Sequence, residues 1–181
     1  MKKFKILSRK MIVDEPFCHI ERQKVELPDG KTTDWFLKKS NDAVIIVPVL
    51  KTGEILLQKN YKHGSGEVVT EFPAGLVDKG ETPQVTAARE LLEETGFSAE
   101  TFKKVGEVFA DPTGSSMRYH FFIAENCEKV ADQNLETGEQ IEVFTVKNLD
   151  VAREILLDSK TKTSSATISV LKFAESFFEN I

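Results

Sequence analysis

The sequence is poor in the features that mark secreted, metal-stapled or membrane proteins. It has only two cysteines, Cys18 and Cys127, which are too far apart in the chain to suggest a disulfide scaffold or a zinc site. We expect both to be small buried or half-buried apolar residues. No apolar run approaches the roughly 20 residues that span a bilayer, and charges interrupt the N-terminus where a signal peptide would be apolar. These absences predict a cytoplasmic protein without membrane association.

An excess of positive charge is also missing. The net charge is −5, so nucleic acid is not an expected partner. The densest basic stretch, residues 2–10, alternates lysine and arginine with Phe4, Ile6 and Leu7. This alternation is typical of a strand or arm.

The 181 residues, 40% of them hydrophobic, are enough for one main domain with a small appendage. There are no repeats or low-complexity segments. Apolar alternation, apolar runs and turn residues such as Pro28-Asp29-Gly30 predict a series of strands. The predicted strands are 4–13, 19–27, 34–39, 42–50, 54–61, 104–110, 118–124 and 142–146.

Three helices are predicted, over residues 83–95, 149–157 and 164–178. In the first, Thr82 is the expected N-cap, Pro83 suits the first helical position and Gly96 suits the end. Its expected inner stripe is Val85, Ala88, Leu91, Leu92 and Thr95. Strands with helices between and after them predict a mixed α/β domain.

The helix over 83–95 carries an unusual set of carboxylates. Glu90, Glu93 and Glu94 stand at i, i+3 and i+4 and therefore project from neighbouring points of one face. A solvated acidic face is the ordinary interpretation, but like charges at this spacing destabilise a helix, and only Arg89 is placed to offset them. Hard oxygen ligands favour Mg²⁺ or Mn²⁺. Because Mg²⁺ sites are often completed by phosphates, a phosphate-containing substrate is predicted.

Residues 75–97, GLVDKGETPQVTAARELLEETGF, resemble the Nudix box, G-x5-E-x7-R-E-U-x-E-E-x-G-U, at every specified position. This resemblance implies the Nudix fold, an α/β fold with a mixed β-sheet sandwiched between helices, preceded here by a small N-terminal β segment. It implies metal ligation by Glu90, Glu94 and the Ala74 carbonyl, with Glu93 as a further ligand or metal-bridging group. Arg89 and Glu81 would orient these ligands.

Three features resemble the ADP-ribose and nucleoside diphosphate sugar branch of the family: the lead-in Glu71-Phe72-Pro73-Ala74-Gly75, Pro112, and the acidic stretch 138–143. The resemblance implies a loop carboxylate that activates water. Glu139 is our candidate for the base, with Glu142 and Glu136 as alternatives or as solvated loop acids.

The branch resemblance also implies substrate-binding residues and a partner subunit. The candidates for substrate contact are Trp35, Lys62, Glu71, Pro112 and Arg118. Lys62 stands where relatives often have arginine, and it offers a point charge in place of a bidentate fork. Residues 1–40 would form an arm that mediates dimerisation and contacts the substrate, and residues 41–181 would form the hydrolase domain of a homodimer. Trp35 or Phe36 would either stack on the base of the substrate or pack in the protein core or dimer interface.

The expected activity is Mg²⁺-dependent cleavage of the pyrophosphate of a nucleoside diphosphate sugar, such as ADP-ribose or GDP-mannose, with Mn²⁺ as a substitute. The products would be a nucleoside monophosphate and a sugar phosphate. Two alternatives remain at this point. The substrate could be a nucleoside triphosphate, or the chain could be a Nudix module that binds a nucleotide without hydrolysing it.

Overall fold

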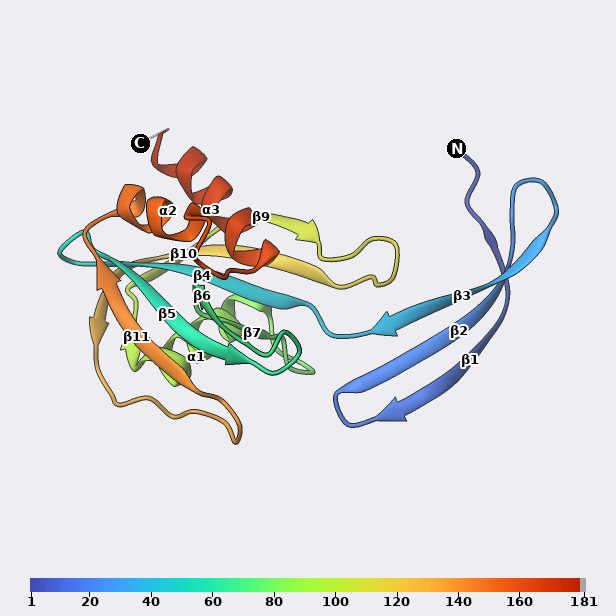
Figure 1. Ribbon diagram of the computed structural model, residues 1–181, viewed down its shortest axis with the longest axis horizontal. Coiled ribbons are helices and arrows are strands. Elements are labelled where there is room, and N and C mark those ends of the chain that lie inside the picture. The colour runs from blue at the N-terminus through green and yellow to red at the C-terminus, as the bar shows by residue number, and fades with distance from the viewer. Residues whose placement is uncertain (180–181) are drawn as a thin grey trace. The chain divides into compact units, whose positions relative to one another are not determined.

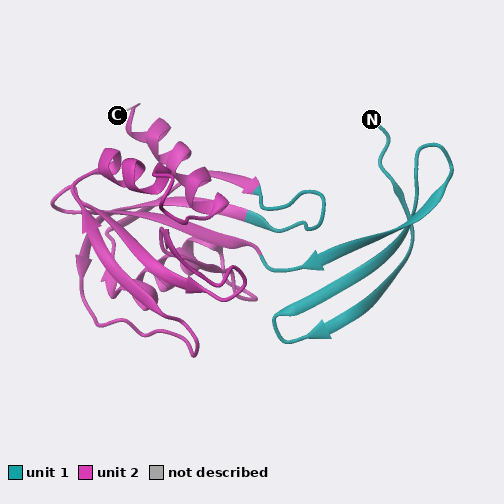
Figure 2. Ribbon diagram, viewed as in Figure 1, with its two compact units in different colours: residues 1–41, 109–118 teal, residues 42–108, 119–181 magenta. Residues whose placement is uncertain are grey.

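The computed structural model describes residues 1–179 and divides the chain into two compact units (Figure 2). One unit consists of residues 1–41 together with 109–118, and the other of residues 42–108 and the chain from Tyr119 onward. The loop 109–118 was not part of the predicted N-terminal segment 1–40. The last two residues of the predicted domain 41–181 lie outside the described residues.

The first unit is built on a three-stranded antiparallel sheet, in the order β1 (Lys5–Glu15), β2 (Cys18–Glu26), β3 (Thr32–Lys39) (Figure 1). The predicted turn between β2 and β3 is present, and Gly30 takes φ 85° while its N–H donates to the Leu27 carbonyl. The loop 109–118 joins β3 where the Lys38 N–H donates to the Gly114 carbonyl at 2.8 Å. The unit is therefore tied together by backbone hydrogen bonds.

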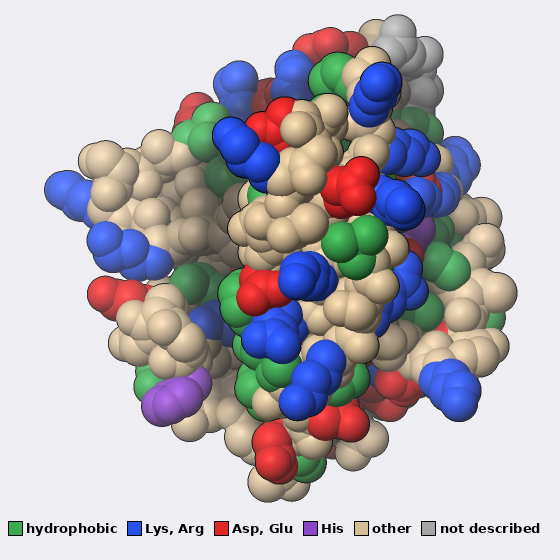
Figure 3. All heavy atoms as spheres, turned by 90° about the vertical axis from the view of Figure 1, so that its right-hand side faces the viewer, with side chains coloured by type: hydrophobic (Ala, Val, Ile, Leu, Met, Phe, Trp, Pro, Cys, Tyr) green, Lys and Arg blue, Asp and Glu red, His purple; other side chains and the backbone are tan. Residues whose placement is uncertain are grey.

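Many large apolar side chains of this first unit are exposed. They are Phe4, Ile6, Leu7, Met11, Ile12, Phe17 and Phe36. Figure 3, a view of one face of the molecule, shows hydrophobic side chains among charged ones. A small sheet that exposes so many apolar groups is typical of a surface that binds another molecule.

The second unit contains an eight-stranded mixed sheet. Its main path runs β11 (Ile141–Val146), β5 (Ile55–Lys62), β4 (Ala43–Leu50), β10 (Arg118–Lys129), β8 (Phe97–Ser98). The strands β6 (Glu67–Glu71), β7 (Ala74–Leu76) and β9 (Thr101–Phe109) pair with β5, β4 and β10, respectively. The pair β4 and β10 is parallel and both strands are largely buried, which confirms the prediction of a strand buried on both faces over 42–50.

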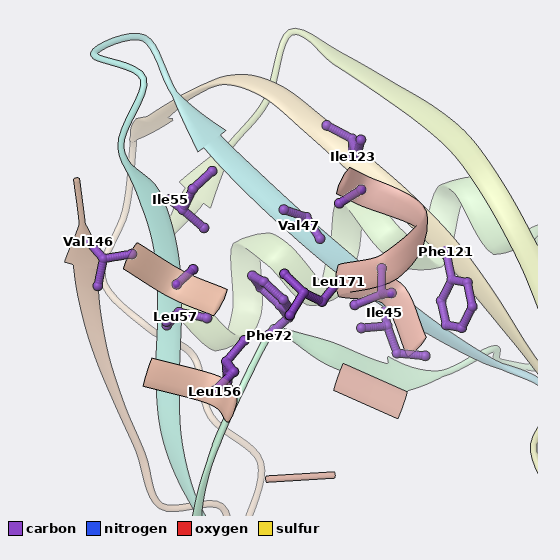
Figure 4. Packing of buried hydrophobic residues seen from close by; sticks show 13 residues of the cluster. Ile45, Val47, Ile55, Leu57, Phe72, Phe121, Ile123, Val146, Leu156 and Leu171 are labelled. Atoms are coloured by element: carbon purple, nitrogen blue, oxygen red, sulfur yellow. The ribbon is translucent and has the colours of Figure 1, made fainter. Parts of the chain in front are cut away.

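Helices cover both faces of this sheet, as the alternation along β4 requires. Val44 and Ile46 pack with Leu91 of α1 (Pro83–Thr95) on one face. Ile45 and Val47 pack on the other face in a larger cluster, which includes side chains of α2 (Leu149–Leu157) and α3 (Ser165–Phe178) (Figure 4). The sheet is thus enclosed between helices, and the predicted fold class is confirmed. No helix among residues 1–179 is long and apolar enough to cross a bilayer.

Helix α1 begins and ends where its local chemistry predicts. The Thr82 hydroxyl accepts from the Val85 N–H, Pro83 occupies the first turn, and Gly96 closes the helix at φ 74°. The predicted inner stripe, however, is partly wrong. Val85, Ala88 and Leu92 are exposed, and the buried residues of the helix are Thr86, Ala87, Leu91, Glu94 and Thr95. The helix is therefore rotated so that a carboxylate, Glu94, enters the interior.

The two cysteines differ in their surroundings. Both are free, but Cys127 is buried under α1 whereas Cys18 is exposed in the N-terminal sheet, so the prediction of burial was wrong for Cys18. Burial raises the pKa of the Cys127 thiol to about 12.

Candidate active site

Arg89 is the centre of the ion pairs on helix α1. Its Nη1 donates to Glu90 and Glu93, at 2.9 Å in both cases, and its Nε and Nη2 contact Glu81 at 3.2 Å. These hydrogen bonds raise the pKa of Arg89 and lower that of the Glu81 carboxyl. The Thr86 hydroxyl also donates to Glu81, at 2.7 Å. The predicted pairing of Arg89 with Glu93 is present, and Glu81 holds the guanidinium from the other side.

The Glu90 carboxylate lies against the backbone of Gly75, which leaves room for it. A Cβ atom at position 75 would lie 2.0 Å from both Cδ and Oε1 of Glu90. Gly75 is held in β7 by its pairing with Val44 of the central strand, so the approach is fixed by the sheet. The first glycine of the predicted motif is therefore required by the carboxylate of a residue fifteen positions later.

Glu94 is the most deeply buried carboxylate of the site, at 2% exposure. Its Oε2 accepts from the Ala74 N–H at 2.9 Å and from the Gln58 side-chain amide at 3.2 Å. Burial nevertheless raises the pKa of Glu94 to about 8, and burial likewise raises that of Glu90 to about 7. The negative charge of Glu90 raises the pKa of Glu94 further, and Glu93 and Glu139 act on Glu90 in the same direction.

This group of carboxylates has the chemistry of a site for a hard divalent cation. In the described part of the chain, no three acidic, histidine or cysteine side chains are gathered tightly enough to form a metal cluster. The reason is visible in the contacts, since Arg89 stands between Glu90 and Glu93 while Glu94 turns one oxygen to Ala74. The negative charges of Glu93 and Glu139 act on Glu90, and that of Glu90 acts on Glu94, so a cation would stabilise Glu90 and Glu94 in ionised form.

Glu139 belongs to this group, whereas Glu142 does not. Glu139 lies in the loop before β11, where its carboxylate accepts from the Glu136 N–H at 2.8 Å, and its charge acts on Glu90. Glu142 pairs in register with Lys59, so it faces away from Gln58 on the opposite side of the sheet and is largely exposed. Of these two glutamates, only Glu139 acts electrostatically on Glu90.

Lys62 and Glu71 are brought together at the edge of the site. The Lys62 ammonium pairs with the buried Glu71 carboxylate at 2.8 Å, and the Asn60 amide donates to the same oxygen at 3.1 Å. Lys62 and Glu139 both line a cavity of about 490 Å³ between β5 and the loop before β11. The structure thus places Lys62 and Glu139, the predicted base, on the wall of the same cavity, with the Lys62 ammonium paired to Glu71.

Trp35, Pro112 and Arg118 all belong to the other unit. The Trp35 indole N–H donates to the Thr113 carbonyl at 3.0 Å, and its ring meets Phe4 edge-on at 5.8 Å. Trp35 and Pro112 line a cavity of about 490 Å³ in that unit. The Arg118 guanidinium lies 5.0 Å from the centre of the Phe109 ring.

Two polar residues of the site were missed in the sequence. Gln58 is fully buried and donates to Glu94, but in the sequence it is one polar residue within an apolar strand. Gln133 donates to the Glu94 carbonyl from a loop without any recognisable pattern. A polar residue in the middle of a buried strand was the available signal for Gln58, and the sequence carried none for Gln133.

Comparison with known proteins agrees with this arrangement. The family model of the NUDIX domain matches residues 39–164, and that of the nucleoside diphosphate sugar hydrolase N-terminal domain matches residues 4–37. An ADP-ribose pyrophosphatase of Bacillus subtilis (strain 168) is 28% identical over 94% of this chain and 92% of its own length. An ADP-ribose pyrophosphatase of Saccharomyces cerevisiae is 33% identical over 79% of this chain and 71% of its own length.

A solved structure described as an ADP compounds hydrolase superposes with a TM-score of 0.82, at 20% sequence identity, over 99% of this chain and 96% of its own. At that identity the likeness shows the fold alone. The family match covers more than half of the chain, and members of this family generally use a divalent metal. The chain belongs to the Nudix hydrolase family, as an enzyme whose Nudix domain follows the N-terminal domain of nucleoside diphosphate sugar hydrolases.

Proposed function

We propose that this protein hydrolyses the pyrophosphate bond of a nucleoside diphosphate sugar, of the ADP-ribose type, with Mg²⁺ as the metal and Mn²⁺ as a substitute. The products are a nucleoside monophosphate and a sugar phosphate. The observation that carries the proposal is the group formed by Glu90, Glu93, Glu94 and Glu139, in which burial and mutual repulsion favour a bound divalent cation. The match of residues 4–37 supports a nucleoside diphosphate sugar over a triphosphate.

The chain's own residues have distinct tasks in this proposal. Glu90, Glu93, Glu94 and the Ala74 carbonyl hold the cation, which when bound acts as a Lewis acid on the diphosphate and makes a water molecule easier to deprotonate. Gly75, which has no side chain, leaves room for the Glu90 carboxylate against the β7 backbone. The Ala74 N–H of the same strand donates to the Glu94 carboxylate and holds it in place.

Arg89 and Glu81 orient the acidic side chains through their hydrogen bonds. Glu139 accepts the proton of the attacking water, and water attacks phosphorus while the bond to the bridging oxygen breaks. We assign this task to Glu139 and not to Glu142, because the charge of Glu139 acts on Glu90 while Glu142 pairs with Lys59. Lys62, supported by Glu71, provides a positive charge for a phosphate at the edge of the site.

The N-terminal unit serves substrate binding and dimerisation in this proposal. Its exposed apolar side chains would be covered by a second copy in a homodimer. The Trp35 ring stacks on the nucleotide base, with Pro112 lining the same cavity, and Arg118 of the same unit provides a positive charge for the substrate. Two unpaired cysteines fit a reducing compartment, and we propose the cytoplasm.

The test is a Mg²⁺-dependent assay on a panel of nucleoside diphosphate sugars and nucleoside triphosphates, with the products identified. Glu93→Gln is expected to fold normally and to lose nearly all turnover. Glu154→Gln replaces an exposed helix glutamate of α2 and serves as the matched control with unchanged activity. Preferred hydrolysis of triphosphates would reassign the substrate, and tight nucleotide binding without any hydrolysis would make the chain a binding module.

A further inference from the structure

The C-terminal end of helix α1 is unusually well supplied with hydrogen-bond donors. The last carbonyls of a helix have no partner within the helix and are commonly left to water. Here the Glu93 carbonyl accepts from the Asn134 N–H at 2.9 Å, and the Thr95 carbonyl accepts from the Lys129 ammonium at 3.1 Å. The Gly96 carbonyl accepts from two N–H groups of the same segment, at residues 130 and 131. One stretch of chain, residues 129–134, therefore satisfies the end of the helix that carries the carboxylates.

The Gln133 side chain is a further donor to the end of α1, and it also contacts the first residue of β11. Its amide nitrogen donates to the Glu94 carbonyl at 2.6 Å and to the Ile141 carbonyl at 3.4 Å. Because both partners are carbonyl oxygens, the nitrogen and not the oxygen of the amide must face them. Gln133 thus connects the end of α1 to the residue at which β11 begins and closes the base of the loop 134–140.

Gly96 makes the close approach of this segment feasible. A Cβ atom at position 96 would lie 2.1 Å from the Ala131 carbonyl oxygen, and the residue has φ 74°, which side chains rarely adopt. The last glycine of the motif therefore ends the helix and also admits the segment that closes over it. The loop held in this way carries Glu139 near its far end, after Gly138 at φ 100°, and the Glu139 carboxylate accepts from the Glu136 N–H.

We propose that Gln133 is a positioning residue for this hydrolase: it acts through Glu139 by holding the loop 134–140 against the end of α1. The proposal rests on the proposed function, because it takes Glu139 as the base. Catalytic geometry tolerates little error, and a misplacement of about 1 Å can cost on the order of 100-fold in rate. Gln133 does not touch the carboxylates of Glu90, Glu93 or Glu94, so its loss leaves their oxygens in place.

The test compares variants of Gln133 by steady-state kinetics on the nucleoside diphosphate sugar that the wild type hydrolyses best. Gln133→Ala is expected to lower kcat by about 10-fold with little change in KM, since proton transfer is impaired and substrate contacts are kept. Gln133→Lys is expected to restore much of kcat, because an ammonium group can donate to the same carbonyls. Gln84→Ala, an exposed glutamine in the first turn of α1, is the matched control.

A double variant separates positioning from general destabilisation. Glu139→Gln is expected to lower kcat by about 100-fold or more. If Gln133 acts through Glu139, adding Gln133→Ala to Glu139→Gln causes no further loss beyond about twofold. A readout independent of activity is hydrogen exchange of the amides of residues 134–141, which we expect to become faster in Gln133→Ala while the first turns of α1 are unchanged.

Failure of this inference differs from failure of the proposed function. The inference is overturned if Gln133→Ala keeps the wild-type kcat while Glu139→Gln is impaired. It is also overturned if Gln133→Ala lowers the residual rate of Glu139→Gln by the same factor as it lowers that of the wild type. If the wild-type protein shows no Mg²⁺-dependent hydrolysis of any nucleoside diphosphate sugar, the proposed function is overturned, and the inference with it. If Glu139→Gln is fully active, the assignment of Glu139 as the base is overturned, and the inference with it.

Discussion

A single methyl group at Gly75 should damage the metal site while leaving the fold intact. In Gly75→Ala the new Cβ would lie 2.0 Å from Cδ of Glu90, where ordinary contact begins at 3.4 Å. The carboxyl group must therefore withdraw by about 1.4 Å. Mg²⁺ accepts its ligands only within a narrow range near 2.0–2.1 Å, so a displacement of this size removes Glu90 from the ligand set. We expect metal affinity to fall by at least about 10-fold and kcat/KM by about 100-fold.

The assay is a Mn²⁺ titration followed by relaxation enhancement of water, together with kinetics at saturating Mg²⁺. Gly106→Ala is the matched control, because its Cβ would meet the Phe173 ring at 2.4 Å in the core, away from the carboxylates. It should cost about 1–3 kcal/mol of stability and leave metal affinity unchanged. Wild-type metal affinity and turnover in Gly75→Ala would refute the role given to Gly75 and the placement of Glu90.

Three further predictions follow from the same structure. Because burial raises the pKa of Glu94 to about 8 and that of Glu90 to about 7, the metal-free folded protein binds more protons than the unfolded chain between about pH 5 and pH 8. The stability of the protein in EDTA should therefore fall as the pH rises through this window, and Glu94→Gln should make Tm depend less on pH. A Tm that rises between about pH 5 and pH 8 would contradict the burial of these carboxyls. Trp35→Ala should raise KM several-fold with kcat nearly unchanged, and an equal effect on kcat in kinetics would argue against a role in base binding. Thiol alkylation should label exposed Cys18 rapidly and Cys127 only after unfolding, because burial raises the pKa of the Cys127 thiol; equal rates in the native state would contradict that burial.

The beginning and end of helix α1 could be predicted because they depend on neighbours in sequence. Thr82 caps the first turn and Gly96 ends the last one through contacts within four residues. The orientation of the helix could not be predicted, because Glu94 is held inside by donors from Ala74 and Gln58, which are distant in the chain. Apolar periodicity alone placed Leu91 and Thr95 correctly in the inner stripe but wrongly added Val85, Ala88 and Leu92.

The strands show the same division between local and distant causes. The long strands, such as β4, have apolar runs that predict them, whereas β6, β7 and β8 were missed since they are short. β7 and β8 also depend on partners that are distant in the chain, β4 and β10, while β6 pairs with the preceding strand β5. The spacing of the motif is sufficient to place the acidic residues of the helix near one another, because helical periodicity is local. It could not choose between Glu139 and Glu142, because that choice depends on the path of the loop that carries Glu139 and on the face of β11 that Glu142 takes.

The central claim is that the carboxylates of α1 hold a divalent cation that in turn binds a diphosphate. The most direct measurement is the anomalous scattering of Mn²⁺ in crystals grown with a non-hydrolysable analogue of a nucleoside diphosphate sugar. We predict an anomalous peak within about 2.5 Å of oxygens from Glu90, Glu94 and the Ala74 carbonyl, with diphosphate oxygens completing the site. A bound analogue with no anomalous peak near these oxygens, and with Arg89 still bridging Glu90 and Glu93, would contradict it.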